Sequence, residues 1–126
     1  MEKDISQTRF VVGLRAAIKI LNHWSTDQKQ HLSILDIPEQ FYASVQSQDN
    51  IHHYDLTEEQ KIRISYVLNI HAKLRTLFMN KDNIYGFMSM ANNNAYFEGQ
   101  TPLDKISFGN FNDLKTTYNH IQGMVI

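Results

Sequence analysis

Apolar residues recur every three or four positions along most of this 126-residue chain, and this spacing limits its fold more than any other feature. Residues three or four apart share one face of a helix, whereas a strand turns alternate residues to opposite faces. The residues that interrupt helices are scarce, since the chain has two Pro and five well-separated Gly. We therefore predict an all-α fold, a compact bundle of about six to seven helices.

Two long amphipathic segments are expected to form the core. The first runs roughly from Ser6 to Trp24. The second begins at a capping box, Thr57-Glu58-Glu59-Gln60, and is predicted to be the longest helix, ending near Met79. The apolar stripe of the first contains Phe10, Leu14, Ala17, Ile18 and Leu21, and that of the second contains Ile64, Val67, Leu68, His71, Leu74 and Phe78.

Two short helices are expected between the long ones. Ser25-Thr26-Asp27-Gln28 fits a capping box, and the helix that it starts is expected to continue to Leu35. A turn follows at 36–38, where Pro38 suits the first position of a helix over 39–47. This succession has the outline of a helix-turn-helix, although many helical bundles contain such a corner.

The C-terminal third is expected to begin with a short helix over 81–90 and a loop over 91–100. Thr101 and Pro102 then fit an N-cap and the first position of another helix. The final helix is predicted to start at Asn110 or Asn112 and to bury Phe111, Leu114, Tyr118 and Ile121. Gly123 stands where a helix-ending C′ glycine belongs, which leaves Met124, Val125 and Ile126 as an apolar tail.

Acidic and basic residues are separated along the chain, although its net charge is only −1. Residues 30–60 contain six acidic and no basic residues, whereas 61–81 contain five basic and no acidic residues. These basic residues spread around their helix at about 100° per residue, so no basic stripe is predicted. DNA affinity comes mainly from Lys and Arg, so the acidic segment favours a structural corner over a DNA reader. The side chains placed to contact bases are Gln40, Ser44 and Gln46.

Several kinds of chemistry lack the residues that they need. The absence of Cys excludes thiol catalysis and disulfides, and the isolated Gly residues do not form a phosphate-binding loop. The adjacent pair His52-His53 is more typical of a solvated loop than of a metal site, and His71 is more typical of a satisfied core or interface histidine than of a catalytic base. We therefore expect no enzyme activity, no metal and no cofactor. The polar start and the absence of a long apolar stretch predict a cytoplasmic protein with no signal peptide and no membrane span.

The sequence is most specific over residues 87–104, which read FMSMANNNAYFEGQTPLD. An aromatic-led short helix, an Asn-bearing loop, an apolar residue two before a Gly and then Thr-Pro-Leu resemble the signature of Xre/MbcA/ParS antitoxins. The Arg-led segment 63–78 and the close of the chain over 114–124 look like the flanking helices of that family. The resemblance extends to 21–45, where the family has a degenerate helix-turn-helix. There Asp36 replaces the Gly that is usual in a DNA-reading turn.

The resemblance implies an Xre-like half, 1–55, and a toxin-binding domain, 56–126, packed as one compact unit. It implies a homodimer and an antitoxin that binds a RES-domain toxin, a small enzyme that consumes NAD, and occludes the active-site cleft of that toxin. The residues hypothesised to contact the toxin lie in the loop and the tail. They are Asn92, Asn94, Phe97, Gly99, Thr101, Pro102, Gly123, Met124, Val125 and Ile126.

Two alternatives stay open at this point. Instead of an antitoxin, the chain is either a DNA-binding transcriptional regulator, of its own operon or of other genes, or an orphan protein-interaction module. The loop in turn either contacts a partner or only connects two core helices, and the tail either anchors a partner or packs on its own monomer.

Overall fold

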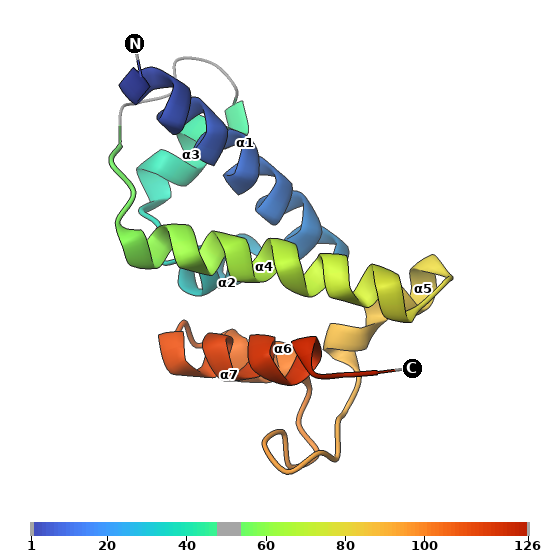
Figure 1. Ribbon diagram of the computed structural model, residues 1–126. Coiled ribbons are helices and arrows are strands. Elements are labelled where there is room, and N and C mark those ends of the chain that lie inside the picture. The colour runs from blue at the N-terminus through green and yellow to red at the C-terminus, as the bar shows by residue number, and fades with distance from the viewer. Residues whose placement is uncertain (1, 48–53, 126) are drawn as a thin grey trace.

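The computed structural model describes residues 2–47 and 54–125, and it confirms the all-α prediction, since this part of the chain contains helices and no strands. In order along the chain, the elements are α1 (Glu2–His23), α2 (Gln28–Leu35), α3 (Glu39–Ser47), α4 (Glu58–Leu77), α5 (Lys81–Gly86), the 3₁₀ helix η1 (Phe87–Ser89), α6 (Pro102–Ile106) and α7 (Phe111–Gln122) (Figure 1). The prediction that α4 is the longest helix is wrong, because residues 2–5 extend α1 to 22 residues against 20 in α4.

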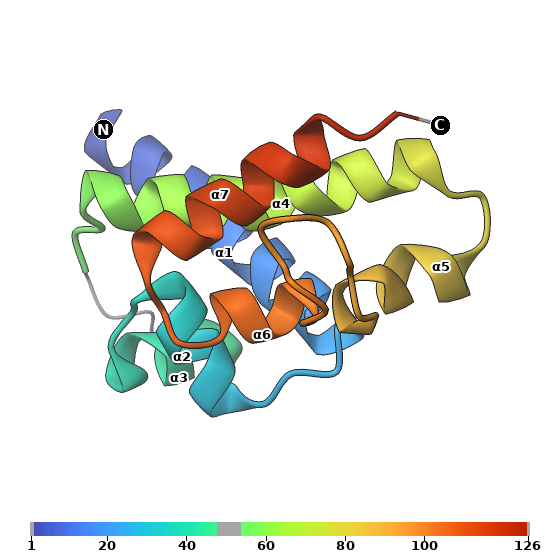
Figure 2. The same cartoon turned by 90° about the horizontal axis from the view of Figure 1, so that it is seen from below.

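The central element is α4, which packs against α1 on one side and α7 on the other (Figures 1 and 2). α7 runs beside α4 in the same direction. The rings of Tyr66 and Tyr118 stack with 4.4 Å between centroids, and the side-chain amide of Gln122 donates to the carbonyl oxygen of Asn69 at 3.2 Å. The core contributions of these three helices include Leu14, Ala17, Ile18, Leu21, Ile64, Val67, Ile70, Leu74, Leu114 and Ile121.

The start of α2 differs from its prediction. Its N-cap is Asp27, whose carboxylate accepts the backbone N–H of Gln30 at 2.9 Å, while the Gln30 side chain accepts the Asp27 N–H at 2.9 Å. Ser25 is not the cap because it lies in the left-handed region with φ 63°, and the hydroxyl of Thr26 donates to Leu21 at the end of α1. Ser25 and Thr26 therefore complete the preceding helix.

The other helix starts lie close to their predictions. α3 begins one residue after Pro38, whose carbonyl oxygen accepts the N–H of Tyr42 at 3.0 Å. The capping box of Thr57 and Gln60 is confirmed at the start of α4. Thr101 caps α6 with Pro102 as its first residue, and Asn110 caps α7. These caps satisfy backbone donors that the first helical turns leave free.

The end of α7 and part of its burial were predicted wrongly. Gly123 has φ −81°, so it does not adopt the left-handed conformation that a C′ glycine was expected to supply. Leu114 and Ile121 are buried as predicted, but Phe111 and Tyr118 are only half-buried. Both rings lie against Tyr66 at the edge of the interface between α4 and α7, which leaves part of each ring open to solvent.

A buried arginine joins the N-terminal helices to the C-terminal ones. Arg63, on α4, is 4% exposed, and its guanidinium donates to the carbonyl oxygens of Ile34 at 3.1 Å and Gly109 at 2.9 Å. Gly109 has φ +81°, and a Cβ atom there would lie 2.7 Å from the carbonyl oxygen of Ser33. The turn before α7 is thus pressed directly against the end of α2, and this contact fixes the start of α7.

Within residues 2–47 and 54–125, every helix is too short or too polar to cross a membrane.

Candidate partner-binding surface

The loop over 90–101 connects η1 to α6 and projects beyond α6 and α7 (Figure 1). Its two arms are tied by backbone hydrogen bonds, because the N–H of Asn92 donates to Gln100 at 3.0 Å and the N–H of Gly99 donates to Asn92 at 2.8 Å. The side-chain oxygen of Asn92 also accepts the N–H of Asn94 at 2.9 Å. Asn92 therefore organises the neck of the loop with its backbone and side chain.

The tip of the loop is a tight turn. The carbonyl oxygen of Asn94 accepts the N–H groups of Phe97 at 3.0 Å and Glu98 at 3.1 Å. Glu98 and Gly99 then both adopt positive φ angles, 51° and 86°. Gly99 tolerates this conformation freely, whereas a residue with a Cβ such as Glu98 is strained there by roughly 1 kcal/mol. The chain reverses at this point because of these two residues.

Aromatic side chains hold the loop against α7. Phe97 is 1% exposed, and the ring of Tyr96 packs edge-on against it with 5.1 Å between centroids. Tyr96 also stacks on His120 at 5.4 Å, and the ammonium of Lys105 lies 4.8 Å from the centre of the Tyr96 ring. We call Tyr96, Phe97, Lys105, Asp113 and His120 the loop clamp.

The clamp contains a strong hydrogen bond. The hydroxyl of Tyr96 donates to a carboxylate oxygen of Asp113 at 2.9 Å. Burial, the hydrogen bond and the charge of Asp113 together raise the pKa of Tyr96 to about 12. The phenol therefore stays protonated at neutral pH and remains a donor. The contacts of Tyr96 with Lys105, Asp113 and His120 were not predicted, because these residues lie 9 to 24 positions away along the chain and nothing local signals the contact.

The sequence-predicted residues of the loop divide into two groups. Asn94 and Gly99 are exposed, together with Asn93, Ala95, Glu98 and Gln100, and they form a mainly polar tip. Phe97 and Pro102 are buried, and Thr101 uses its hydroxyl to accept the N–H of Asp104 at 3.0 Å. The second group offers little or no side-chain surface to a partner in this conformation and instead supports the tip.

The tail leaves α7 in a different direction from the loop (Figures 1 and 2). Gly123 is exposed, Met124 is half-buried and packs against the core, and Val125 is 89% exposed. Ile126 lies outside the described residues. The structure thus places an exposed apolar side chain, Val125, directly after a residue that anchors the tail to the molecule.

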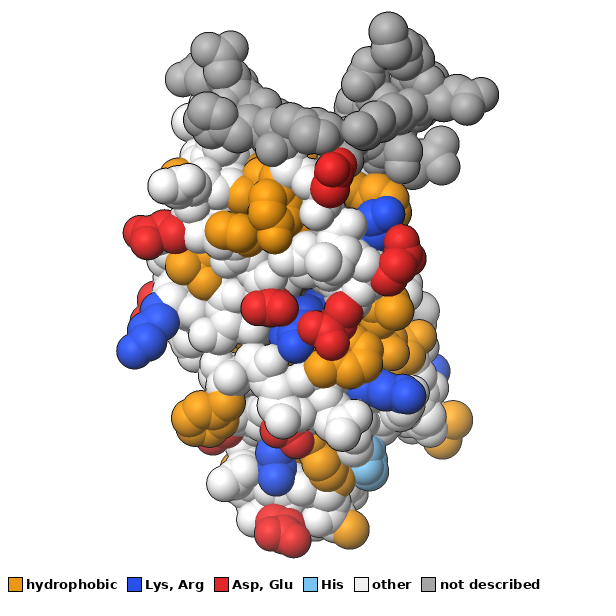
Figure 3. Space-filling view, turned by 90° about the vertical axis from the view of Figure 1, so that its left-hand side faces the viewer, with side chains coloured by type: hydrophobic (Ala, Val, Ile, Leu, Met, Phe, Trp, Pro, Cys, Tyr) orange, Lys and Arg blue, Asp and Glu red, His pale blue; other side chains and the backbone are white. Residues whose placement is uncertain are grey.

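The candidate DNA-contacting residues lie on α3. Gln40 and Gln46 are exposed, and the Gln46 amide donates to the hydroxyl of Tyr42 at 3.3 Å. Ser44 is buried at 7% exposure, so its placement as a base-contacting side chain is wrong: it shares the core-facing side of α3 with Phe41 and Val45. α3 contains no Lys or Arg. Asp36, before α3, and Glu39, its first residue, are exposed. The face of the molecule in Figure 3 carries acidic side chains interspersed with basic and hydrophobic ones.

The turn between α2 and α3 has the geometry that a glycine would favour. Asp36 adopts φ 54° and ψ 49°, in the left-handed region. Asp is among the few residues other than Gly that enter this region readily. Asp36 therefore adopts a backbone conformation that Gly favours, and it adds a negative charge to the turn.

The histidines hold no metal cluster in the part of the chain that the structure describes, where no three His, Asp or Glu side chains converge. His52 and His53 lie outside this part. His71 is half-buried and lies face to face with Tyr85 at 5.6 Å. Its Nδ1 atom is buried and has no hydrogen-bond partner among the described residues, so His71 is not a satisfied core histidine. The other interpretation, an interface histidine, stays a prediction. Burial, with the nearby charges of Arg75 and His23, lowers the pKa of His71.

Comparison of the chain with protein-family models, with curated proteins and with solved structures gives no match.

Proposed function

We propose that this protein is an antitoxin of the Xre/MbcA/ParS type, which binds a RES-domain toxin and occludes the cleft in which that toxin consumes NAD. The observation that supports this most is the exposed and tightly organised loop over 90–101. Two backbone hydrogen bonds close its neck, and the loop clamp fixes it on α7. A loop that is already ordered loses little conformational entropy when it binds, so more of its contact energy contributes to affinity.

The proposal gives the residues of the loop and the tail distinct roles. Asn94 and Gln100 offer amide donors and acceptors at the tip, and Gly99 lets a partner's backbone approach closely. Val125 offers an apolar anchor. Phe97 and Pro102 act from beneath by holding the tip in place. Inhibition by occlusion is steric, so it requires no catalytic group on this chain.

The experiment begins with gentle purification of the tagged chain from its native host and mass spectrometry of proteins recovered in equal amount. We expect a small RES-domain protein whose NAD consumption resumes when the complex is separated. Recovery of the chain without such a protein contradicts the proposal.

Loop variants then test the contact surface. Asn94→Arg combined with Gln100→Arg adds bulk and charge at two exposed positions, so the fold should persist while inhibition of NAD consumption weakens at least tenfold. Ala43→Arg, at an exposed position on α3, is the control and should inhibit like the wild type. Equal inhibition by the loop variant and the control excludes the loop as the contact surface.

A further inference from the structure

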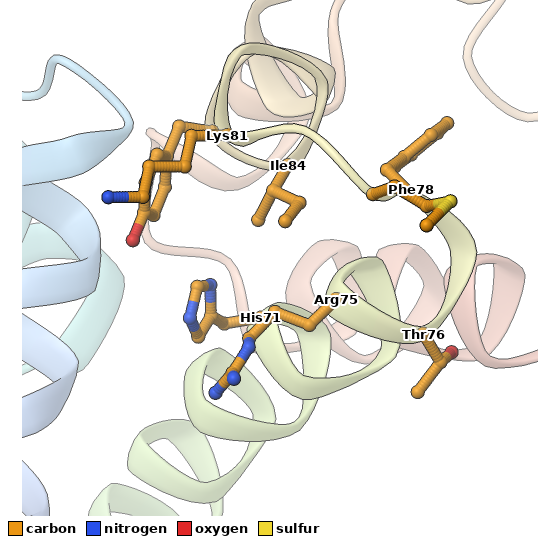
Figure 4. Close-up of a pocket in the computed structure, with 8 residues that line it drawn as sticks. His71, Arg75, Thr76, Phe78, Lys81 and Ile84 are labelled. Carbon is orange, nitrogen blue, oxygen red and sulfur yellow. The ribbon is translucent and has the colours of Figure 1, made fainter.

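A groove of about 530 Å³ lies between the end of α4 and the start of α5, away from the loop over 90–101 (Figure 4). His71 and Arg75 reach it from α4, and Ile84 and Lys81 reach it from α5. Phe78, in the connection between the two helices, adds an apolar wall. Figure 4 shows the Ile84 side chain directed across the gap toward α4, and the groove is open along one side.

Stacked rings make one wall of the groove rigid. The ring of Tyr85 stacks on that of His71, at 5.6 Å between centroids and 7° between ring planes, and on that of His23, at 4.2 Å and 16°. Side chains of α4 and α1 therefore both engage the Tyr85 ring. A base of single-stranded nucleic acid needs a free aromatic face on which to stack, so a ring that already stacks on two histidines is poorly suited to that role.

The groove carries positive charge without a neutralising neighbour in its lining. Arg75 and Lys81 are exposed, and no Asp or Glu is among the described residues that line the groove. The described residues show no ion pair to either cation, whereas Lys61 and Arg63, at the other end of α4, pair with Glu58 and Glu59 at 3.3 and 3.4 Å. The acidic residue closest in sequence, Asp82, is exposed outside the lining.

We propose that this groove binds an acidic peptide segment of a protein partner, with carboxylates paired to Arg75 and Lys81 and an apolar side chain packed on Ile84 and Phe78. Opposite charge on the partner compensates Arg75 and Lys81, which form no ion pair with the described residues, and burial of an apolar side chain adds affinity. A small molecule is less well suited, because such ligands are usually enclosed over about 70–90% of their surface. This inference does not depend on the antitoxin proposal, since it concerns a separate surface.

The test uses a displayed library of random dodecapeptides selected on the whole wild-type chain. We expect enrichment of peptides with several Asp or Glu residues around an aliphatic or aromatic one. Their amide shift changes in NMR spectra should centre on Arg75, Lys81 and Ile84. The variant Arg75→Glu with Lys81→Glu should bind the selected peptides at least tenfold more weakly, since attraction becomes repulsion at both sites.

A matched control separates the groove from general electrostatics. Lys29→Glu with Lys115→Glu changes the net charge by the same amount at exposed positions on α2 and α7, and it should keep its affinity within about twofold. Arg75→Gln with Lys81→Gln repeats the test without added negative charge. Circular dichroism establishes that each variant is folded.

Four results overturn the proposal. They are selection without acidic enrichment, equal weakening in the groove and control variants, tighter binding of a dodecathymidylate than of any selected peptide, and a dimer in sedimentation equilibrium that dissociates only in the groove variant. The last result identifies a second copy of this chain as the occupant.

Discussion

The guanidinium of Arg63 donates to the carbonyl oxygen of Gly109 at 2.9 Å, across 46 positions of sequence. The same nitrogen also donates to Ile34 at 3.1 Å, near the end of α2. The last carbonyl groups of a helix lack partners within the helix and favour a nearby cation. One side chain of α4 therefore donates to a carbonyl oxygen at the end of α2 and to another in the turn before α7.

Removal of this cation should destabilise the whole fold. Arg63→Met leaves a buried carbonyl group, that of Ile34, and a partly buried one, that of Gly109, without their charged donor, so we expect a loss of about 3 kcal/mol in the free energy of unfolding. Arg63→Lys should lose roughly half as much stability, because an ammonium group keeps the charge but lacks the planar guanidinium with its fixed N–H directions. Urea denaturation measures both, with the exposed Arg75→Met as the control that should stay within about 0.5 kcal/mol of wild type. Equal stabilities for the Arg63 and Arg75 variants would show that the network contributes nothing.

Gly109 should tolerate no side chain. A Cβ atom there lies 2.7 Å from the backbone oxygen of Ser33, at φ +81°, so Gly109→Ala combines steric overlap with a left-handed strain. We expect a loss of about 3 kcal/mol or more. Gly86→Ala is the matched control, since its Cβ meets nothing within 4 Å, and it should be neutral or slightly stabilising. Thermal unfolding of the two variants tests the close contact of Gly109 with Ser33. A Gly109→Ala melting temperature close to that of wild type would contradict this packing.

The helices were predictable from the sequence because their signals are local. Apolar spacing, the capping box at Thr57 and the N-cap at Thr101 act within one or two turns, and the structure has both caps. The start of α2 was harder, because Ser25 and Asp27 each precede a Gln by three positions. The choice between them depends on where α1 ends, and this is decided by the hydroxyl of Thr26, which donates to Leu21.

The candidate surface was predictable only as a segment. An Asn-rich stretch before Thr101 predicts a loop, but it does not tell which side chains turn inward. Phe97 is buried because it packs against His120, and Ser44 is buried because it lies on the core-facing side of α3 with Phe41 and Val45. The groove was missed for a related reason. The basic residues of α4 do spread around the helix, but Lys61 and Arg63 are paired, and Arg75 meets Lys81 only through the fold of α5.

The stability of the fold should decrease in mild acid because of His31. Its ring is buried, with Nε2 at 2.8 Å from the Thr26 hydroxyl and Nδ1 at 2.9 Å from the Tyr42 hydroxyl. Thr26 donates its own proton to Leu21, so it accepts from Nε2–H, and Nδ1 accepts from Tyr42. Burial lowers the pKa of His31, which the Thr26 hydrogen bond and Asp27 offset only in part. The neutral ring is therefore the form that the fold requires.

The direction of this pH dependence follows from the proton binding of the folded and unfolded chains. The unfolded chain, with a histidine pKa near 6.5, binds a proton at a higher pH than folded His31 does, so the free energy of unfolding falls as the pH drops below about 6.5. The loss levels off below the folded pKa. His71 acts in the same direction. Urea denaturation between pH 7.5 and 5 should show a weaker pH dependence in His31→Gln than in wild type, and an unchanged dependence would exclude His31 as a source.

Tyr96→Phe should loosen the loop without unfolding the protein. The variant loses the hydrogen bond to Asp113 but keeps the ring that stacks on His120, so we expect a cost of about 1 kcal/mol. Amide hydrogen exchange should accelerate at Asn92 and Gly99 and stay unchanged in α4. Tyr118→Phe is the control, since its ring stacks on Tyr66 and its hydroxyl makes no hydrogen bond among the described residues. Equal exchange in the two variants would show that the hydroxyl of Tyr96 does not order the loop.

The two phenylalanines Phe97 and Phe108 lie eleven positions apart and should differ strongly in their response to truncation. Phe97 is 1% exposed, so Phe97→Ala removes a large buried ring and leaves a cavity beneath the loop, at a cost of about 3–4 kcal/mol. Phe108 is 89% exposed, and Phe108→Ala should change the free energy of unfolding by less than about 0.5 kcal/mol. Because Phe97 supports the tip from beneath, its truncation should also weaken partner binding, whereas that of Phe108 should not. Denaturation midpoints and partner affinity measured on the two variants test both statements, and a similar response from each would contradict the inward placement of Phe97.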